Sequence, residues 1–285
     1  MKNIGVIGCG LMGAGIAEVC ARHALRVTVI ERDGPSLAAG EERIRKSLDR
    51  ALTSKKIEQS DYYSALGNLT FSLDYDSLAQ ADLVIEAVAE VEELKFEVFR
   101  NVDAVLEKDD AILASNTSSI QISRLAGVTK RPERVVGLHF FNPVPVLRLV
   151  EIIAGELTSE ETLSRVRTFA TDQLDKKPIL APDRAGFVVN FLLIPYLLSA
   201  IRLVEAHLAT AEDIDTGMVE GCAHPMGPLA LTDLIGLDTT LFIADTLYED
   251  LQEPQLVAPQ LLRDMVAAGE LGRKSGQGFF SYAKK

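Results

Sequence analysis

The sequence is poor in cysteine and in positive charge. Cys9, Cys20 and Cys222 are its three cysteines among 285 residues. They are odd in number, scattered and without a CxxC pair, which predicts reduced thiols in a cytoplasmic protein and no metal site. Lysine and arginine number 29 against 41 acidic residues, a formal net charge of −12. This balance argues against a general nucleic-acid-binding protein, which needs a basic surface.

The sequence also lacks a long uninterrupted hydrophobic run. The longest apolar stretch lies near residues 187–201, where Asn190 and Pro195 interrupt it, so it is too short and too broken for a membrane span. Residues 1–7 lack the apolar core and the cleavage site of a signal peptide. A length of 285 residues with 47% hydrophobic residues suffices for one large or two ordinary domains. We therefore expect a globular protein without a membrane segment.

A glycine-rich turn follows the first apolar segment, residues 3–8. The turn reads Gly8-Cys9-Gly10-Leu11-Met12-Gly13, then a helical pattern follows, then a second strand ending at Glu31. Gly8 permits the tight turn, Gly10 lets the backbone approach a pyrophosphate, and Gly13 lets the helix pack on the strand. Glu31 is expected to hold ribose hydroxyls and to repel a 2′-phosphate. The sequence thus predicts a dinucleotide site that takes NAD, with NADP less favoured.

Strands and helices alternate through the first two thirds of the chain. Residues 36–67 read as an inserted helical hairpin with its tip at residues 54–56. Strands are predicted over 68–73, over 81–90 with its end at Glu90, and over 111–119, and a helix over 92–106. The last strand runs into Asn-Thr-Ser-Ser at 116–119, where open parallel sheets bind ligands. We predict a Rossmann-type, doubly wound, mainly parallel sheet.

The pattern changes after Ile153. A helix is expected over 157–174, and residues 177–183 close the first domain, so that residues 1–183 form an NAD-binding domain. Residues 184–285 read as an all-helical domain without a convincing strand, too apolar to stand alone. We therefore expect it to contribute to substrate binding and to a homodimer interface. Its first long helix carries one polar residue, Asn190, in an apolar stretch, and a buried amide needs a partner.

Residues 137–151, GLHFFNPVPVLRLVE, contain two strand-like runs on either side of a turn at residues 142–145. Proline at 143 and 145 excludes a continuing helix. Two strands folded back across this turn would place His139 opposite Glu151. An imidazole held by a carboxylate is what a general base needs, although a lone histidine beside two phenylalanines is more often a core residue.

Several stretches together resemble the 3-hydroxyacyl-CoA dehydrogenase family, in particular its short bacterial 3-hydroxybutyryl-CoA members. They are IGCGLMGAGIAEV, ASNTSSIQI, GLHFFNPVPVLRLVEII, GFVVNFLLIPYL, DIDTGM, HPMGPLALTDLIGLDTT and GRKSGQGFF. The resemblance covers nearly the whole chain. It implies His139 as base, Glu151 as its orienting carboxylate, and Ser118 and Asn190 at the substrate oxygen.

The same resemblance implies further ligand contacts. NAD-site positions match Glu31, Glu90, Lys95, Asn142 and Lys274. Ser47, in the helical hairpin, matches a position near CoA. The family lysine of that hairpin falls near Ser54, and Lys55 is the candidate to replace it. The implied reaction is reversible oxidation of an (S)-3-hydroxyacyl-CoA to the 3-ketoacyl-CoA, with the domains closing over both ligands.

Three other functions stay open at this point. A β-hydroxyacid dehydrogenase acting on free acids would carry a lysine where this chain has Gly186, which argues against it. A dehydrogenase acting on an acyl-carrier-protein thioester is barely separable by sequence. A non-catalytic NAD-binding relative is disfavoured by the joint presence of Ser118, His139, Glu151 and Asn190.

Overall fold

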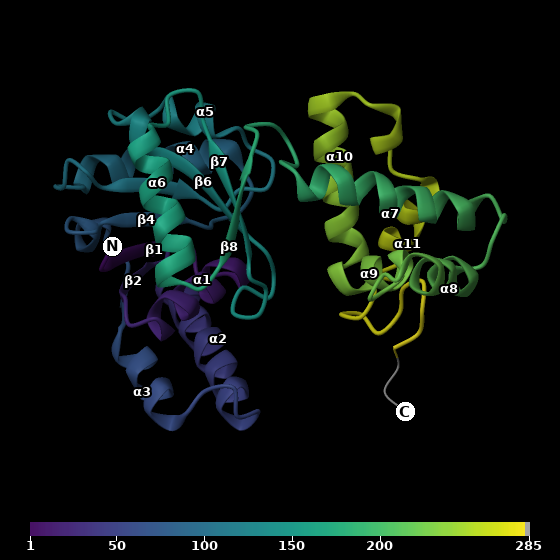
Figure 1. The fold of residues 1–285 in the computed structure, drawn as a ribbon, viewed down its shortest axis with the longest axis horizontal. Coiled ribbons are helices and arrows are strands. Elements are labelled where there is room, and N and C mark those ends of the chain that lie inside the picture. The colour runs from purple at the N-terminus through teal and green to yellow at the C-terminus, as the bar shows by residue number, and fades with distance from the viewer. Residues whose placement is uncertain (283–285) are drawn as a thin grey trace. The chain divides into compact units, whose positions relative to one another are not determined.

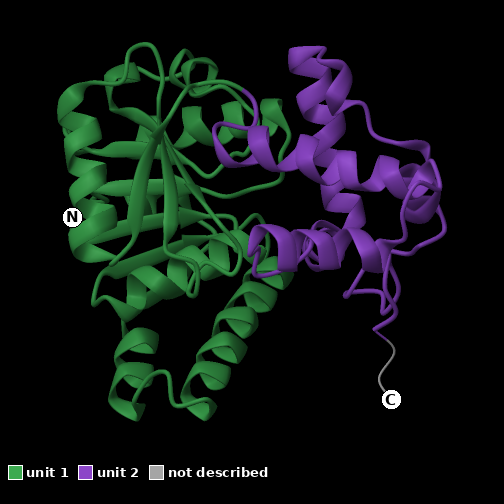
Figure 2. Cartoon of the chain, turned by 45° about the vertical axis from the view of Figure 1, so that its right-hand side comes forward, with its two compact units in different colours: residues 1–184 green, residues 185–285 purple. Residues whose placement is uncertain are grey.

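A computed structural model describes residues 1–282, which divide after Arg184 into two compact units (Figure 2). The first unit is built on one sheet in the order β3-β2-β1-β4-β5-β6-β7-β8. Its strands are β1 Asn3–Ile7, β2 Arg26–Ile30, β3 Leu69–Ser72, β4 Leu83–Glu86, β5 Ile112–Ser115, β6 Val135–Phe140, β7 Leu149–Ala154 and β8 Lys177–Ala181. Neighbouring strands are parallel except β6 and β7, which are antiparallel. The predicted doubly wound, mainly parallel sheet is confirmed.

Apolar strands explain why this sheet is buried on both faces. All six residues of β6 and all four of β4 and of β5 are buried, as expected for parallel strands covered by helices. The covering helices are α1 Leu11–Arg22, α4 Glu92–Val105, α5 Ile122–Ala126 and α6 Glu160–Thr168. Order reverses between β1 and β4, and open α/β sheets bind ligands beside such a reversal, at the carboxyl ends of the strands.

The inserted helical hairpin is present as α2, Gly34–Thr53, and α3, Gln59–Gly67. Figure 1 shows these two helices extending away from the sheet. The carboxylate of Asp33 caps α2 by accepting from Ser36 N at 2.7 Å. Lys55 lies in the exposed tip with φ of 57°.

Two strand predictions need correction. The strand expected over 81–90 ends at Glu86, because the Glu86 carboxylate accepts from Val88 N at 2.7 Å and turns the chain. Glu90 therefore lies in a loop. Residues 177–181, expected only to close the domain, form β8 beside β7. Their largely exposed side chains gave no periodic signal, because β8 lies at an edge of the sheet.

Within residues 185–282 the second unit is helical, with α7 Val189–Glu205, α8 Ala211–Cys222, α9 Pro228–Ile235, α10 Leu237–Leu251 and α11 Gln260–Ala267. Its core gathers leucines and isoleucines from α7, α9, α10 and α11, among them Leu198, Leu229 and Leu247. Asp233 ties down the last loop by accepting from the backbone N–H groups of Phe279 and Phe280, each at 2.9 Å. Among the helices described, none is both long and apolar enough to cross a membrane.

Candidate active site

The glycine turn between β1 and α1 has the geometry that a bound pyrophosphate requires. Gly8 has φ of +85°, and a Cβ there would lie 2.7 Å from the Ala87 carbonyl oxygen. A Cβ on Gly13 would lie 1.8 Å from the Gly8 carbonyl oxygen, so only glycine lets α1 start this close to the strand. At Gly10 nothing lies within 4 Å of an added Cβ, which leaves open space before the N-terminus of α1. That space suits an anion.

A cavity of about 450 Å³ adjoins this turn at the carboxyl ends of β1, β2 and β4. Glu31 lies at its wall, where its carboxylate accepts from Cys9 N at 2.6 Å and from Arg32 N at 3.1 Å. The cavity is lined by Ile7, Gly8, Gly10, Ile30, Glu31, Arg32, Ser36, Leu73, Tyr75, Ala87, Val88, Ala89, Leu94, Glu97, Val98 and Asn101. Walls that are apolar in part, with the Glu31 carboxylate at the end of β2, fit a nucleoside with ribose hydroxyls.

Some lining residues were absent from the sequence prediction, and some predicted residues do not line the cavity. Leu73, Tyr75 and residues 87–89 were missed; they follow β3 and β4 directly, so strand ends were the available signal. Leu11 and Met12 open α1 and do not line this cavity, and Leu11 is exposed.

His139 and Glu151 face each other across β6 and β7, as the turn geometry predicted. They are direct partners in the antiparallel register, and His139 Nδ1 lies 2.7 Å from Glu151 Oε2. Both side chains are buried, and the Phe141 ring packs on the imidazole with 4.7 Å between centroids. Asn116 Oδ1 accepts from Phe140 N at 2.9 Å and so joins the end of β5 to the end of β6.

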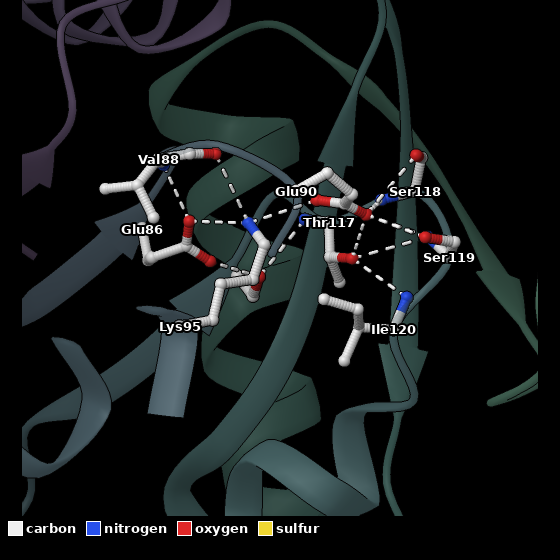
Figure 3. Close-up of polar contacts among 9 residues, drawn as sticks. Glu86, Val88, Glu90, Lys95, Thr117, Ser118, Ser119 and Ile120 are labelled. Atoms are coloured by element: carbon white, nitrogen blue, oxygen red, sulfur yellow. Dashed lines mark hydrogen bonds and ion pairs between the residues drawn. The ribbon is translucent and has the colours of Figure 1, made fainter. Parts of the chain in front are cut away.

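A second polar cluster surrounds Glu90 at the end of β5 (Figure 3). Glu90 Oε1 accepts from Thr117 Oγ1 at 2.5 Å, from Ser118 N at 2.9 Å and from Ser119 Oγ at 2.9 Å. Burial opposes ionisation of Glu90, but the Lys95 charge and these hydrogen bonds outweigh it and lower the pKa of the carboxyl. Ser118, the predicted substrate contact, thus has its backbone fixed by an ionised carboxylate.

Lys95 and Glu86 are the fully buried charged members of this cluster. The Lys95 ammonium lies between two carboxylates, 2.6 Å from Glu86 Oε1 and 3.1 Å from Glu90 Oε2. Glu86 also accepts from Ser115 Oγ at 2.6 Å. Lys95, predicted to line the NAD site, is only 1% exposed, and Glu86 was not predicted at all.

The turn between His139 and Glu151 is held from two sides. It contains a cis Asn142–Pro143 bond, and Asn142 itself is exposed. Val144 packs on α1, where a Cβ on Gly15 would meet it at 2.9 Å. Lys176, another residue missed from sequence, donates its buried Nζ to the carbonyls of Val144 at 2.5 Å and Leu147 at 2.7 Å. The turn is therefore anchored to the helix that follows the glycine turn.

The remaining predicted residues lie outside these clusters. Ser47 hydrogen-bonds to the buried Glu18 carboxyl, and Lys55 is exposed at the hairpin tip. In the second unit, Asn190 is buried near the start of α7, and Lys274 Nζ lies 2.5 Å from Asp238 Oδ1. The ligand contacts expected of these four residues stay predictions.

Nothing in the surroundings of the three cysteines, within residues 1–282, indicates a metal-binding or reactive thiol. Burial raises the pKa of Cys9 to about 12, with a further contribution from Glu31, and burial raises that of Cys20 to about 12. Both are therefore protonated thiols at neutral pH. Cys222 is exposed. Among residues 1–282, no three His, Cys, Asp or Glu side chains are grouped to hold a metal ion.

A glycine turn at a helix N-terminus, a carboxylate at the end of β2 and a doubly wound sheet are the features of a dinucleotide-binding protein of the NAD type. The comparisons with known proteins add the family. Residues 3–184 match the model of the NAD-binding domain of 3-hydroxyacyl-CoA dehydrogenase, and residues 186–282 match that of its C-terminal domain. The chain belongs to the 3-hydroxyacyl-CoA dehydrogenase family and is an oxidoreductase that acts on CH–OH groups with NAD.

Individual relatives match over their full length. A 3-hydroxybutyryl-CoA dehydrogenase of Mycobacterium tuberculosis is 52% identical over 282 residues, 99% of each chain. The crystal structure of FadB2 from M. tuberculosis matches with a TM-score of 0.97 at 52% identity, covering 99% of both chains. The crystal structure of (S)-3-hydroxybutyryl-CoA dehydrogenase from Ralstonia eutropha matches with a TM-score of 0.92 at 43% identity, covering 100% of both chains.

Proposed function

We propose that this protein interconverts (S)-3-hydroxybutyryl-CoA and acetoacetyl-CoA, or closely related short-chain 3-hydroxyacyl-CoA thioesters. The names of the relatives at 52% and 43% identity support this substrate. The observation that carries the chemistry is the buried His139–Glu151 pair, with 2.7 Å between Nδ1 and Oε2. His139 lies near the carboxyl end of β6, and the glycine turn follows the carboxyl end of β1. NAD, when bound, supplies the hydride acceptor at C4 of its nicotinamide.

His139 is the proposed general base. Its Nδ1–H donates to Glu151, which leaves Nε2 as the acceptor for the 3-hydroxyl proton; this tautomer is inferred from the hydrogen-bond network. Glu151 is completely buried, so its carboxylate keeps the imidazole oriented and stabilises the imidazolium that forms. A base placed in this way accelerates proton removal by about 10²–10⁴-fold.

Ser118 and Asn190 are the proposed donors to the substrate oxygen as it becomes a carbonyl or, in reverse, an alkoxide. The hydrogen bonds from Ser118 N and neighbouring hydroxyls to Glu90 support Ser118, because a fixed backbone presents the hydroxyl without reorganisation. Asn190 is supported by its buried amide in an apolar helix and by the resemblance of its segment to the family. Glu31 is the proposed partner of the adenine ribose.

The test is NADH absorbance decay with three acceptors, namely acetoacetyl-CoA, the same acyl group on an acyl-carrier protein, and free acetoacetate. We expect turnover to be fastest with acetoacetyl-CoA. Faster turnover on the carrier-protein thioester would favour the biosynthetic alternative. Absence of turnover on every thioester, with NADH binding intact, would favour a non-catalytic relative.

We also propose a cytoplasmic homodimer formed through the helical unit. Leu192, Leu203 and Phe242 are large apolar side chains that this unit leaves at least 40% exposed, and exposed apolar side chains of this size favour a protein interface. Sedimentation of the full chain should give twice the mass of 31.0 kDa. A monomer at micromolar concentration would refute the dimer.

A further inference from the structure

Glu86 is a buried carboxylate that the proposed mechanism does not use. It is the last residue of β4 and is 1% exposed. Its Oε1 accepts from Lys95 Nζ at 2.6 Å and from Val88 N at 2.7 Å, and its Oε2 accepts from Ser115 Oγ at 2.6 Å. Burying a carboxylate is unfavourable because it loses its hydration, and an ion pair offsets that loss only with good geometry. The sheet thus buries the Glu86 charge at the carboxyl end of β4, on the side of the sheet where the ligand is expected.

The Lys95 ammonium forms ion pairs with both Glu86 and Glu90 and so links the two carboxylates. Lys95 is 1% exposed, and its donors go to Glu86, to Glu90 and, at 3.5 Å, to the carbonyl of Val88 (Figure 3). Because the two carboxylates lie on either side of the ammonium, Glu86 fixes the place from which Lys95 attracts Glu90. Glu90 in turn holds residues 117–119 by hydrogen bonds from three hydroxyls, that of Ser118 at 3.5 Å among them, and from two backbone N–H groups.

Glu86 also reaches the same segment by a second route. Ser115 Oγ, which donates to Glu86, accepts from Thr117 N at 3.1 Å. The segment that carries Ser118 is therefore held on one side through Ser115 and on the other through Lys95 and Glu90. Removal of the Glu86 carboxylate would weaken both supports, although Glu86 itself hydrogen-bonds to Lys95, Val88 and Ser115 and acts on Ser118 only indirectly.

We propose that Glu86 is a positioning residue for this site, which acts on Ser118 through Lys95 and Glu90 and sets the net charge of the cluster at the carboxyl ends of β4 and β5. The proposal rests on the function proposed above. The adenosine half of a dinucleotide lies over β1 and β2, where the cavity and Glu31 are, so its other half extends across the strand-order reversal toward β4 and β5. Glu86 ends β4, and Glu90 accepts from the backbone N–H groups that follow β5.

The charge of the cluster gives the proposal a distinctive consequence. One ammonium and two carboxylates sum to +1 − 2 = −1. The nicotinamide ring is cationic when oxidised and neutral when reduced, so a buried negative charge nearby favours NAD⁺ over NADH. The variant Glu86→Gln brings the cluster to zero charge. It should therefore weaken NAD⁺ binding relative to NADH by about threefold to tenfold, because charges interact strongly in a partly desolvated site.

The experiment measures the dissociation constants of NAD⁺ and NADH by calorimetry and, separately, kcat and KM for acetoacetyl-CoA. Glu86→Gln should raise the ratio of the NAD⁺ constant to the NADH constant and lower kcat about tenfold, with a smaller change in KM, as expected when the loss is in the transition state. Glu86→Asp keeps the charge and shortens the reach, so it should lower kcat and leave the ratio unchanged.

The matched control is Glu93→Gln, which removes the same charge from an exposed position on the helix that carries Lys95. It should leave both the ratio and kcat within twofold of the wild type, since exposed charges are screened. A Glu86→Gln protein whose melting temperature falls while its ratio stays at the wild-type value would overturn the proposal. If Glu86→Gln does not fold, an unchanged kcat in Glu86→Asp would overturn it equally.

The binding arm is independent of the substrate. If wild-type protein binds NADH but reduces no thioester, the proposed function fails while the ratio still tests Glu86. If acetoacetyl-CoA is reduced and the ratio does not change in Glu86→Gln, the function stands and the proposal about Glu86 fails.

Discussion

In the first unit, the carboxyl ends of the strands form two regions that are built in different ways. On the β1–β2 side, the backbone of Gly8, Gly10 and Gly13 leaves room for a ligand, and the Glu31 carboxylate faces a cavity with both apolar and polar walls. On the β4–β7 side, charged and polar side chains dominate; Glu86, Lys95, His139 and Glu151 are buried, and Glu90 and Ser118 are half-buried. The difference teaches that the glycine turn and Glu31 come from one continuous segment, residues 8–31, whereas the residues proposed for the chemistry come from several separate strands.

The sharpest way to break this comparison is His139→Gln. The glutamine can still hydrogen-bond to Glu151 but cannot take a proton, so turnover of acetoacetyl-CoA should fall by about 10²–10⁴-fold. The NADH dissociation constant from calorimetry should stay within about threefold, because His139 is not among the residues that line the cavity next to the glycine turn. Turnover within tenfold of the wild type would remove His139 from the chemistry.

Glu151→Gln tests whether His139 needs the charge of its partner or only its shape. Glu151 is 0% exposed and its partner lies 2.7 Å away, so the amide keeps the volume but no longer stabilises an imidazolium. We expect kcat to fall by about 10²-fold, with the far-UV circular dichroism unchanged. If only the melting temperature falls, Glu151 has a structural role.

Gly13→Ala tests the glycine turn on the β1–β2 side. The added Cβ would lie 1.8 Å from the Gly8 carbonyl oxygen, so the turn must shift, at a cost of about 1–3 kcal/mol in the free energy of unfolding. NADH affinity should fall about tenfold, since the turn no longer presents its N–H groups. Urea unfolding and calorimetry measure the two effects.

Gly10→Ala is the matched control for that variant. An added Cβ meets nothing within 4 Å, so the free energy of unfolding should change little, while NADH affinity falls because the methyl group occupies the space for phosphate. Equal destabilisation of both variants would show that the glycines serve packing alone.

The smallest effect on ligand binding is expected at the amino ends of the strands, where Asp82 precedes β4. Asp82 accepts from Lys2 N at 2.6 Å, from Asn3 N at 3.0 Å and from Lys108 Nζ at 2.5 Å. Burial opposes its ionisation, but these partners outweigh burial and lower the pKa to about 2 from its ordinary 3.8. A lowered folded-state pKa gives stability that is present above pH 3.8 and lost as pH falls through about 2.

The melting temperature of Asp82→Asn should therefore be below that of the wild type at neutral pH, and the gap should close between about pH 4 and pH 2. NADH affinity at neutral pH should not change, because Asp82 is at the amino end of β4, away from the carboxyl ends of the strands. A gap that persists at pH 2 would show that shape, not charge, is responsible.

The same contrast explains what the sequence could predict. The glycine turn, the strand that ends one residue before Glu31 and the helical hairpin are local patterns, so residue spacing alone located them to within a residue or two. The His139–Glu151 pairing was also predictable, because the proline turn fixes which residues of two consecutive strands face each other.

Glu86 and Lys176 were not predictable in this way. Glu86 read as one residue inside a longer strand, and only the contact of its carboxylate with Val88 N reveals that the strand ends there. Lys176 meets the 142–147 turn through tertiary structure, 29 residues or more along the chain from its partners. Partners from distant segments leave no periodic or local signal for such residues.

The most direct test of the two-part account compares His139→Gln and Gly13→Ala in one set of measurements, namely NADH affinity by calorimetry and single-turnover reduction of acetoacetyl-CoA at saturating NADH. The two variants should show opposite patterns. His139→Gln should bind NADH normally and fail to reduce the substrate, whereas Gly13→Ala should bind NADH poorly yet reduce the substrate at near the wild-type rate once saturated. Parallel loss of binding and of reduction in both variants would contradict it.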